Sequence, residues 1–553
     1  MLHGIKVLDL TTGGAGLCGH LLADMGASVQ HWFAQSLLGD SVALDAQGQL
    51  RDPSLRAWCI NQDYAAIDWV AEPQRLHAML PNVDIVLHDR TDAQLRAADL
   101  NPEALLEHYP TLLLVSMTAF GAIGPKSDFA ATDLIALAAS GHLAVSGAAD
   151  SAPVRVRTPQ AFAHAAADAA VGVLLGLAAR QATGLGQRLD VSAAQSTTLA
   201  TLSRSLDGAV GQPSPQRAAY GTALGGIEVR NQYALADGWA LVLPGILPPL
   251  AAFMQRLVEW VHADGHCGDW VLTEDWGAAG MKLATGGFEA QQWAELEAGI
   301  AAQLAGLTKA EVMAVAVERR LLVAPIMSVA DLLASDHARA RGLVVQRQGR
   351  SRLGPFAHFE RSPLPLEATT AVDWQAPVSS AAQASATAAG ALPLAGLKVL
   401  DLFWVVAGPG ATRMLADYGA TVVHVETRKR LDMVRNVPPY IDGVAEPERA
   451  ACHHSTNTNK LNLSLDLSNP ESRAVLDDLI RWADVVAESF APGVAERLGF
   501  GREHVRALNP DAIIISSCLM GQDGPWRDYA GYGNTAAAVS GFHALTGYAG
   551  QPP

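Results

Sequence analysis

The seven residues GIKVLDL, from Gly4 to Leu10, and the seven residues GLKVLDL, from Gly396 to Leu402, decide the fold of this chain. Each is a short apolar run with a β-branched residue that ends in an acid and a leucine, which is typical of a buried parallel strand. The two segments differ at a single position, so the chain repeats its own first strand. A repeat of this kind predicts that one fold occurs twice.

The repeat continues well beyond the first strand. LADMGASVQHW, from Leu22, matches LADYGATVVHV, from Leu415. Further along, the two copies keep a constant offset of 400 residues at the following pairs: Asp84 and Asp484, Pro110 and Pro510, Ser116 and Ser516, Gly121 and Gly521, Ser140 and Ser540. Short apolar strands such as VVHVE, ADVVAES and AIIISSC alternate with helical stretches. This alternation predicts an α/β fold, a Rossmann-like parallel sheet with helices on both faces, duplicated, whose ligand lies at the carboxyl ends of the strands.

Breaks in composition divide the chain into five segments. Ala, Ser and Pro dominate 371–393, which we interpret as a flexible linker. A Gly- and Pro-rich stretch begins at Asp207 and marks a smaller α+β domain in the first copy. We therefore expect a first large domain at 1–206, a small domain at 207–325, a return segment to the first large domain at 326–370, the linker, and a second large domain at 394–553.

Composition excludes several classes of function. The net charge is −16, from 39 basic and 55 acidic residues, which argues against nucleic acid as a partner. The five cysteines show no metal-ligand or disulfide spacing, so we expect no metal and a reducing, cytoplasmic setting. The first ten residues lack the pattern of a signal peptide, and we expect no membrane partner.

Both copies resemble the class III coenzyme A transferases, the CaiB/BaiF family. In the second copy the resemblance is carried by NTNKLNLSLDL (Asn457–Leu467) and ADVVAESFAPGVAERLGFG (Ala483–Gly501). In the first copy it is carried by ATGLGQRLDVSAAQS (Ala182–Ser196), YALADGWALVL (Tyr233–Leu243) and VAPIMSVADLLASDHARARG (Val323–Gly342). The resemblance implies an interlocked architecture, in which the two copies form an intramolecular pseudo-dimer; further homo-oligomerisation stays open.

The resemblance also implies a reaction. In the family, an aspartate attacks an acyl-CoA thioester, and CoA passes through an aspartyl-CoA intermediate to a small carboxylic acid. Acyl-CoA and the acid are substrates, and no metal is involved. The residues of the second copy that match the family's CoA-binding positions are Val406, Ala407, Thr427, Leu465, Leu467, Ser468, Ser489, Phe490, Arg497 and Tyr532. Arg497 is the expected phosphate ligand among them.

The first copy departs from this pattern at the same positions. Arg90, Ala97 and Thr132 stand where the second copy has Phe490, Arg497 and Tyr532. The resemblance places the nucleophile 21 residues before Thr183 of the TG-x-GQ motif, which is Phe162 here. Two other groups lie nearby. Asp168 is about 240° further around the helix, so we expect it to face elsewhere, and His164 is the second candidate. We interpret the first copy as a structural partner of the second.

The nucleophile of the second copy is expected outside the given sequence. Adding the offset of 400 to position 162 places it near position 562, whereas the sequence ends at Pro553. We therefore expect a piece of a longer transferase that is inactive by itself. An acyl-CoA racemase or transferase-lyase of the same fold, and a non-catalytic CoA-binding or assembly subunit, remain alternatives. The acyl donor and acceptor are not readable from these residues.

Overall fold

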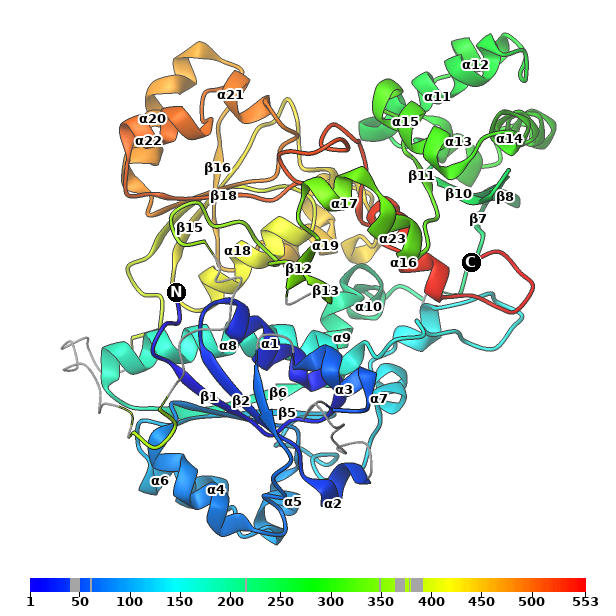
Figure 1. The fold of residues 1–553 in the computed structure, drawn as a ribbon. Helices are drawn as coiled ribbons and strands as arrows, with labels where there is room; N and C mark the ends of the chain where they lie inside the picture. The colour runs from blue at the N-terminus through cyan, green and yellow to red at the C-terminus, as the bar shows by residue number, and fades with distance from the viewer. Residues whose placement is uncertain are drawn as a thin grey trace.

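Two parallel sheets of the same topology form the centre of the structure, a computed structural model that describes residues 1–39, 50–59, 62–213, 216–347, 350–363, 373–376, 378 and 391–553 (Figure 1). The first has the order β3-β2-β1-β4-β5-β6, and the second has the order β16-β15-β14-β17-β18. The strands of the first sheet are β1 (Lys6–Asp9), β2 (Ser28–Trp32), β3 (Asp63–Ala65), β4 (Ile85–His88), β5 (Leu113–Thr118) and β6 (Gln187–Ser192). Those of the second are β14 (Lys398–Leu402), β15 (Thr421–Glu426), β16 (Leu461–Ser464), β17 (Val485–Glu488) and β18 (Ile513–Ser516). The predicted fold class is confirmed.

Register relates the two sheets residue by residue. Asp9 pairs with His31 between β1 and β2, and Asp401 pairs with His424 between β14 and β15. A slip of one residue would turn every side chain to the opposite face of its sheet. Because the same residue types meet at the same ladder position, each side chain of one sheet can be compared directly with its counterpart in the other.

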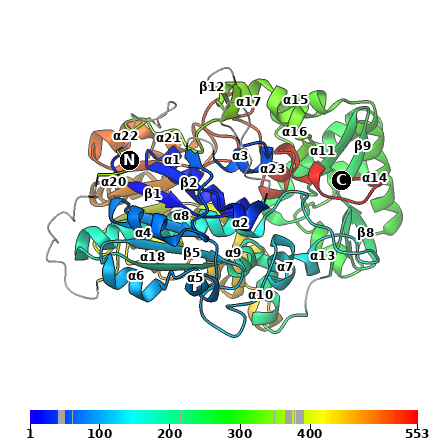
Figure 2. The same cartoon turned by 60° about the horizontal axis from the view of Figure 1, so that its bottom comes forward.

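Helices cover both faces of the first sheet (Figures 1 and 2). On one face, α1 (Leu17–Asp24) and α8 (Ala161–Thr183) share a core with β1 and β5. On the other, apolar residues of α4 (Pro73–Met79), α5 (Asp92–Ala97) and α6 (Pro102–His108) pack in a second core. Helix α8 is long and apolar enough to cross a membrane, but it packs on β5 and β6. Its apolar character is therefore that of a core helix.

The second sheet is covered unequally. Helices α20 (Arg473–Trp482) and α22 (Arg502–Leu508) pack on one face through Leu476, Ile480 and Val505. On β18, Ile513 and Ile515 are 59% and 39% exposed, whereas their counterparts Leu113 and Val115 on β5 are fully buried. In the first copy α8 and β6 contact β5, and β18 has no such cover among the described residues.

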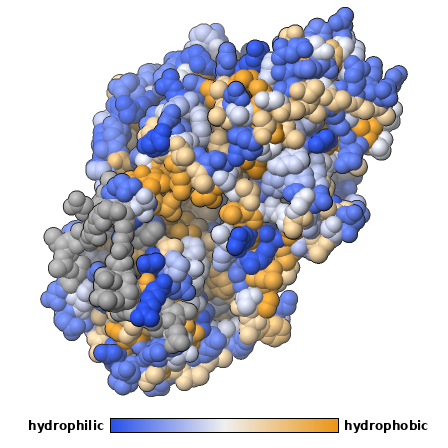
Figure 3. Space-filling view, turned by 45° about the vertical axis from the view of Figure 1, so that its right-hand side comes forward, coloured by the Kyte–Doolittle hydropathy of each residue, from blue (hydrophilic) through white to orange (hydrophobic). Residues whose placement is uncertain are grey.

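Apolar side chains also gather in patches elsewhere on the surface, as one face of the molecule shows (Figure 3).

A smaller domain of the first copy packs against the second copy. It holds the antiparallel sheet β9 (Gln232–Leu235), β10 (Gly238–Val242) and β11 (Val323–Pro325), with helices including α11 (Ala251–Ala263), α14 (Ala290–Ala305) and α15 (Lys309–Arg319). Tyr529, Ala538 and Val539 of the second copy belong to the core of this domain. The Tyr529 hydroxyl donates a hydrogen bond to the Val323 carbonyl over 3.0 Å, so the two copies share one buried interface.

The segment after the small domain runs along the second copy before it returns to the first. In α17 (Asp336–Ala340), the His337 ring stacks on Trp526 with centroids 4.9 Å apart. Contacts with the first large domain come later, where Lys6 Nζ donates to the carbonyls of Asp373 and Ala376. Most of the linker expected at 371–393 lies outside the described residues. The domain boundaries drawn from sequence stay predictions.

Replacing Tyr529 by phenylalanine tests this interface. The change leaves the buried Val323 carbonyl without its donor, which we expect to cost about 1–3 kcal/mol of unfolding free energy. Differential scanning calorimetry should show a lower melting temperature. Tyr418→Phe is the control, because Tyr418 is 42% exposed and its loss should be nearly neutral. Equal melting temperatures for the two variants would contradict the shared interface.

Candidate functional site

Eight of the ten predicted CoA-binding residues follow strands at the carboxyl edge of the second sheet. Val406 and Ala407 follow β14, Thr427 follows β15, and Ser489 with Phe490 follows β17. Leu465, Leu467 and Ser468 follow β16. Because the strands are parallel, these segments emerge at one edge, where ligands of open α/β sheets bind. The structure thus brings together segments that lie far apart in the sequence.

An aromatic surface with a cation forms at this edge. The Trp404 ring lies 5.9 Å from the Phe490 ring, which lies 5.6 Å from Phe500. The Arg430 guanidinium is 5.4 Å from the Trp404 ring centroid, within the range of a cation–π contact. The Trp404 amide donates to Ser489 Oγ over 3.2 Å. The sequence analysis did not single out Trp404 or Arg430, although two aromatic residues follow β14 and four polar or basic residues follow β15.

An ion pair and a hydrogen bond to Asp466 hold the segment after β16. Leu465 and Leu467 pack in the same core as Phe490. Lys429 Nζ lies 2.6 Å from an Asp466 oxygen, and the Ser468 hydroxyl donates to the same carboxylate over 2.6 Å. The Lys429 hydrogen bond and those from Ser468 lower the pKa of Asp466 to about 2. Lys429 therefore ties the β15 and β16 loops together at the rim.

Arg497 and Tyr532 lie further out. Arg497 is exposed on α21 (Val494–Leu498), and its guanidinium donates to the Gly493 carbonyl over 3.2 Å. It has no carboxylate partner among the described contacts, so it is open to an anion. Tyr532 is half-buried at the start of α23 (Gly533–Val539), where burial raises its pKa. Among the described residues Arg497 makes no hydrogen bond or ring contact with Phe490 or Tyr532, and the binding role of Arg497 and Tyr532 stays a prediction.

A buried ion pair lies beneath the loops. Asp401, at the end of β14, accepts hydrogen bonds from Lys460 Nζ at 2.9 Å and from Thr412 Oγ1 at 2.8 Å. Both charged side chains are almost fully buried. Burial by itself would raise the pKa of Asp401, but His424 and Lys460 hold it below its ordinary value. The lowered pKa favours the charged form of Asp401, whereas burial lowers the pKa of Lys460.

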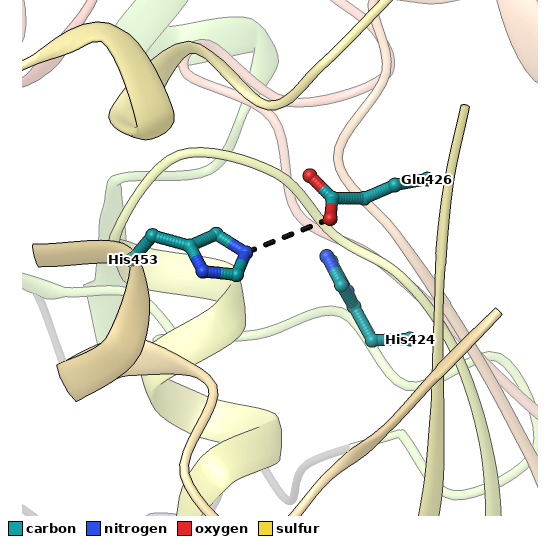
Figure 4. A group of neighbouring side chains, drawn as sticks. All are labelled: His424, Glu426 and His453. Atoms are coloured by element: carbon teal, nitrogen blue, oxygen red, sulfur yellow. Dashed lines mark ion pairs between the residues drawn. The ribbon is translucent and has the colours of Figure 1, made fainter. Parts of the chain in front are cut away.

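A second charged group continues this network along β15. Glu426 accepts hydrogen bonds from Arg435 at 2.6 Å and from Asn462 at 3.0 Å, and His453 Nε2 lies 3.6 Å away (Figure 4). His424, Glu426 and His453 have ligand atoms within 4.8 Å of one another, which is close enough for a metal ion. The forked Arg435 contact, however, already occupies the carboxylate. We interpret the group as a cluster of charged and titratable side chains around the Arg435–Glu426 ion pair rather than as a metal centre.

The first copy has replaced this network with apolar side chains. By sheet register, Gln62 stands at the position of Lys460, Phe33 at that of Glu426 and Tyr64 at that of Asn462. In α3 (Pro53–Trp58), Leu55 stands at the position of His453. Phe33, Leu55 and Tyr64 share a small apolar cluster. Burial raises the pKa of Asp9, the counterpart of Asp401, although the nearby His31 lowers it.

The carboxyl edge of the first sheet is closed by its own side chains. Asp89 accepts a hydrogen bond from the Thr12 amide at 2.7 Å and one from Arg90 Nε at 2.9 Å. Arg90 also donates to the Thr12 hydroxyl over 3.2 Å. These three residues satisfy one another, whereas in the second copy Val406 is exposed and the Trp404 ring lies tilted against Phe490.

Phe162, the position at which the resemblance places the nucleophile, lies beside the first loop. It is the second residue of α8, and a β-carbon built on Gly14 would lie 3.4 Å from its own. Of the two neighbouring candidates, His164 is exposed and Asp168 is half-buried. No functional role for Asp168 follows from this placement.

Comparisons with known proteins concern the chain as a whole. Residues 2–381 and 394–553 match the model of CoA-transferase family III. A probable CoA-transferase of Mycobacterium tuberculosis is 27% identical over 97% of this chain and 67% of its own length. The succinate–glutarate CoA-transferase of Agrobacterium fabrum is 41% identical, over 29% of this chain and 41% of its own length.

Solved structures agree on the fold. A CaiB/BaiF family protein from Brucella suis superposes with a TM-score of 0.56 at 20% sequence identity, covering 68% of this chain and 96% of that one. At this identity the likeness speaks for architecture alone. The two matched segments of the family model correspond to the two sheets described above. The chain is therefore a member of CoA-transferase family III.

Proposed function

We propose that the polypeptide to which these residues belong transfers CoA from an acyl-CoA to a carboxylic acid through an aspartyl-CoA intermediate. The second copy supplies the CoA site. Its aromatic surface takes an apolar or planar part of CoA, and Arg497 takes a phosphate. Relatives that act on succinate with glutarate, or on acetyl-CoA with oxalate, support small carboxylic acids as the substrate class.

The observation that carries this proposal is the convergence of the predicted residues at the carboxyl edge of the second sheet only. There, Arg430 is exposed and Trp404 and Phe490 are half-buried, whereas Thr12, Asp89 and Arg90 bind one another in the first copy. A site needs groups that are not already satisfied by their neighbours. The first copy then serves as the structural partner whose small domain packs against the second.

A racemase or transferase-lyase would use the same CoA site. Both activities need an additional base at the α-carbon of the acyl group, and no described residue is placed to act as that base. Phe162 cannot act as a nucleophile, which favours a non-catalytic role for the first copy but says nothing about the second.

Replacing Arg497 by alanine tests the CoA site. A charge-assisted hydrogen bond to a phosphate contributes about 1.5–3 kcal/mol, so we expect CoA to bind roughly 10- to 100-fold more weakly. Isothermal titration calorimetry with CoA measures the change. Arg473→Ala is the control: Arg473 donates to the Gly499 carbonyl nearby and should affect the affinity little. An unchanged dissociation constant in Arg497→Ala, or no binding by the unaltered chain, would contradict the proposed site.

A further inference from the structure

The loop between β14 and α18 (Ala407–Asp417) contains a residue in an unfavourable conformation. Val405 has a φ of 75°, in the left-handed region that β-branched residues rarely adopt. It directly precedes Val406 and Ala407, which are predicted to contact CoA. At the counterpart in the first copy, Gly13 has a φ of 59°, so the first loop makes the same left-handed turn with a glycine. Glycine adopts this conformation without strain and valine does not, so the turn is common to both copies and the strain belongs to the second copy.

One buried carboxylate holds Val405 in place. The Val405 amide donates to both oxygens of Asp432, at 3.1 and 3.0 Å. Asp432 is fully buried and lies 27 residues along the chain, after β15. It also accepts a hydrogen bond from the Val434 amide at 3.1 Å. A left-handed valine persists only where its surroundings fix it, and this carboxylate provides the fixing contact.

Asp432 is itself anchored to the sheet. Its backbone amide donates a hydrogen bond to Glu426 Oε1 over 3.2 Å. Arg435 in turn donates hydrogen bonds to both oxygens of Glu426. Glu426 ends β15, so a rigid chain of hydrogen bonds runs from the strand through Asp432 to Val405. In the first copy, Phe33 stands at the position of Glu426, and Asp89 accepts a hydrogen bond from the Thr12 amide, as Ser489 accepts one from the Trp404 amide in the second copy.

We propose that Asp432 is a positioning residue, which holds the Phe403–Val406 loop in the shape that binds CoA by fixing Val405 in its left-handed conformation. This proposal rests on the proposed function, because it concerns the same CoA site. It assigns the buried Glu426–Arg435 group a purpose: the group fixes Asp432, and Asp432 fixes the loop. Asp432 does not touch the ligand and acts only through the backbone of Val405.

Three variants test the proposal by the affinity for CoA in isothermal titration calorimetry. Asp432→Ala should weaken binding by about tenfold, because the loop loses its fixing contact. Asp432→Asn keeps one acceptor oxygen and should fall between it and the unaltered chain. Val405→Gly in the Asp432→Ala background should restore most of the affinity, since glycine adopts a positive φ without strain. A residue with a general role in stability would show no such rescue.

Asp89→Asn is the matched control, because Asp89 holds the corresponding loop of the first copy and its change should leave CoA affinity unaltered. Unaltered affinity in Asp432→Ala, or failure of Val405→Gly to rescue it, would overturn the positioning role while leaving the CoA site standing. If Asp432→Ala does not fold, Val405→Gly combined with Asp432→Asn decides by the same criterion. No binding by the unaltered chain would overturn the proposed function and this proposal together.

Discussion

Lys460→Met is expected to lower the free energy of unfolding by about 3–5 kcal/mol, the usual cost of leaving one partner of a buried ion pair alone. The substitution keeps the length of the side chain but removes the ammonium that lies 2.9 Å from Asp401. Asp401 is fully buried, so its charge would have no solvent to compensate the loss. Chemical denaturation followed by circular dichroism measures the change.

The first copy provides the control. Gln62 occupies the position of Lys460 there and donates to the Trp58 carbonyl over 2.9 Å. Gln62→Met removes one neutral hydrogen bond, so we expect a loss of about 0.5–1.5 kcal/mol. If Lys460→Met and Gln62→Met lower the free energy of unfolding by the same amount, Asp401 is not ionised in the folded protein.

The same variant has a predicted pH dependence. In the unaltered chain the folded-state pKa of Asp401 lies below its ordinary value, so its stabilising contribution is present above about pH 4 and is lost as the pH falls through the folded-state pKa. Without Lys460, burial should raise that pKa, as it does for Asp9. The stability difference between the variant and the unaltered chain should therefore narrow as the pH is lowered.

Arg435→Met is expected to cost a similar amount, about 3–5 kcal/mol. It leaves the Glu426 carboxylate, which is almost fully buried, with only Asn462 and a backbone amide as clear hydrogen-bond donors. It should also weaken CoA binding, since Glu426 anchors Asp432. Urea denaturation and CoA titration of the same preparation measure both effects.

Arg341→Met is the matched control for Arg435. Arg341 also pairs with a carboxylate, Asp523, but the two side chains are 27% and 72% exposed, against 8% and 5% for Arg435 and Glu426. Exposed pairs contribute about 0–1 kcal/mol because water screens them. If both arginine substitutions lower the free energy of unfolding equally, the burial of the Arg435–Glu426 pair does not stabilise the second copy.

The sequence predicted the duplicated sheets because the information is local. The GIKVLDL and GLKVLDL strands, and the helices between strands, carry their own periodicity, and a constant offset relates the copies. The positions at the strand ends followed from that topology. The gathering of Val406, Ser489 and Phe490 at one edge could be expected for the same reason.

The buried network could not be predicted in the same way. Asp401 and Lys460 are 59 residues apart, and their pairing depends on how β16 lies beside β15. Acids inside the apolar runs KVLDL and VVHVE were a signal that charges enter the core, but not of which partner each would meet. The left-handed conformation of Val405 could not be predicted from the sequence either, because valine rarely adopts a positive φ.

Hydrogen–deuterium exchange with and without saturating CoA tests most directly whether the second copy alone binds CoA. We expect protection in the 403–407 and 489–497 segments, and none in the corresponding 11–16 and 88–97 segments of the first copy. Protection of both sets, or of the first-copy segments alone, would contradict a single CoA site in the second copy.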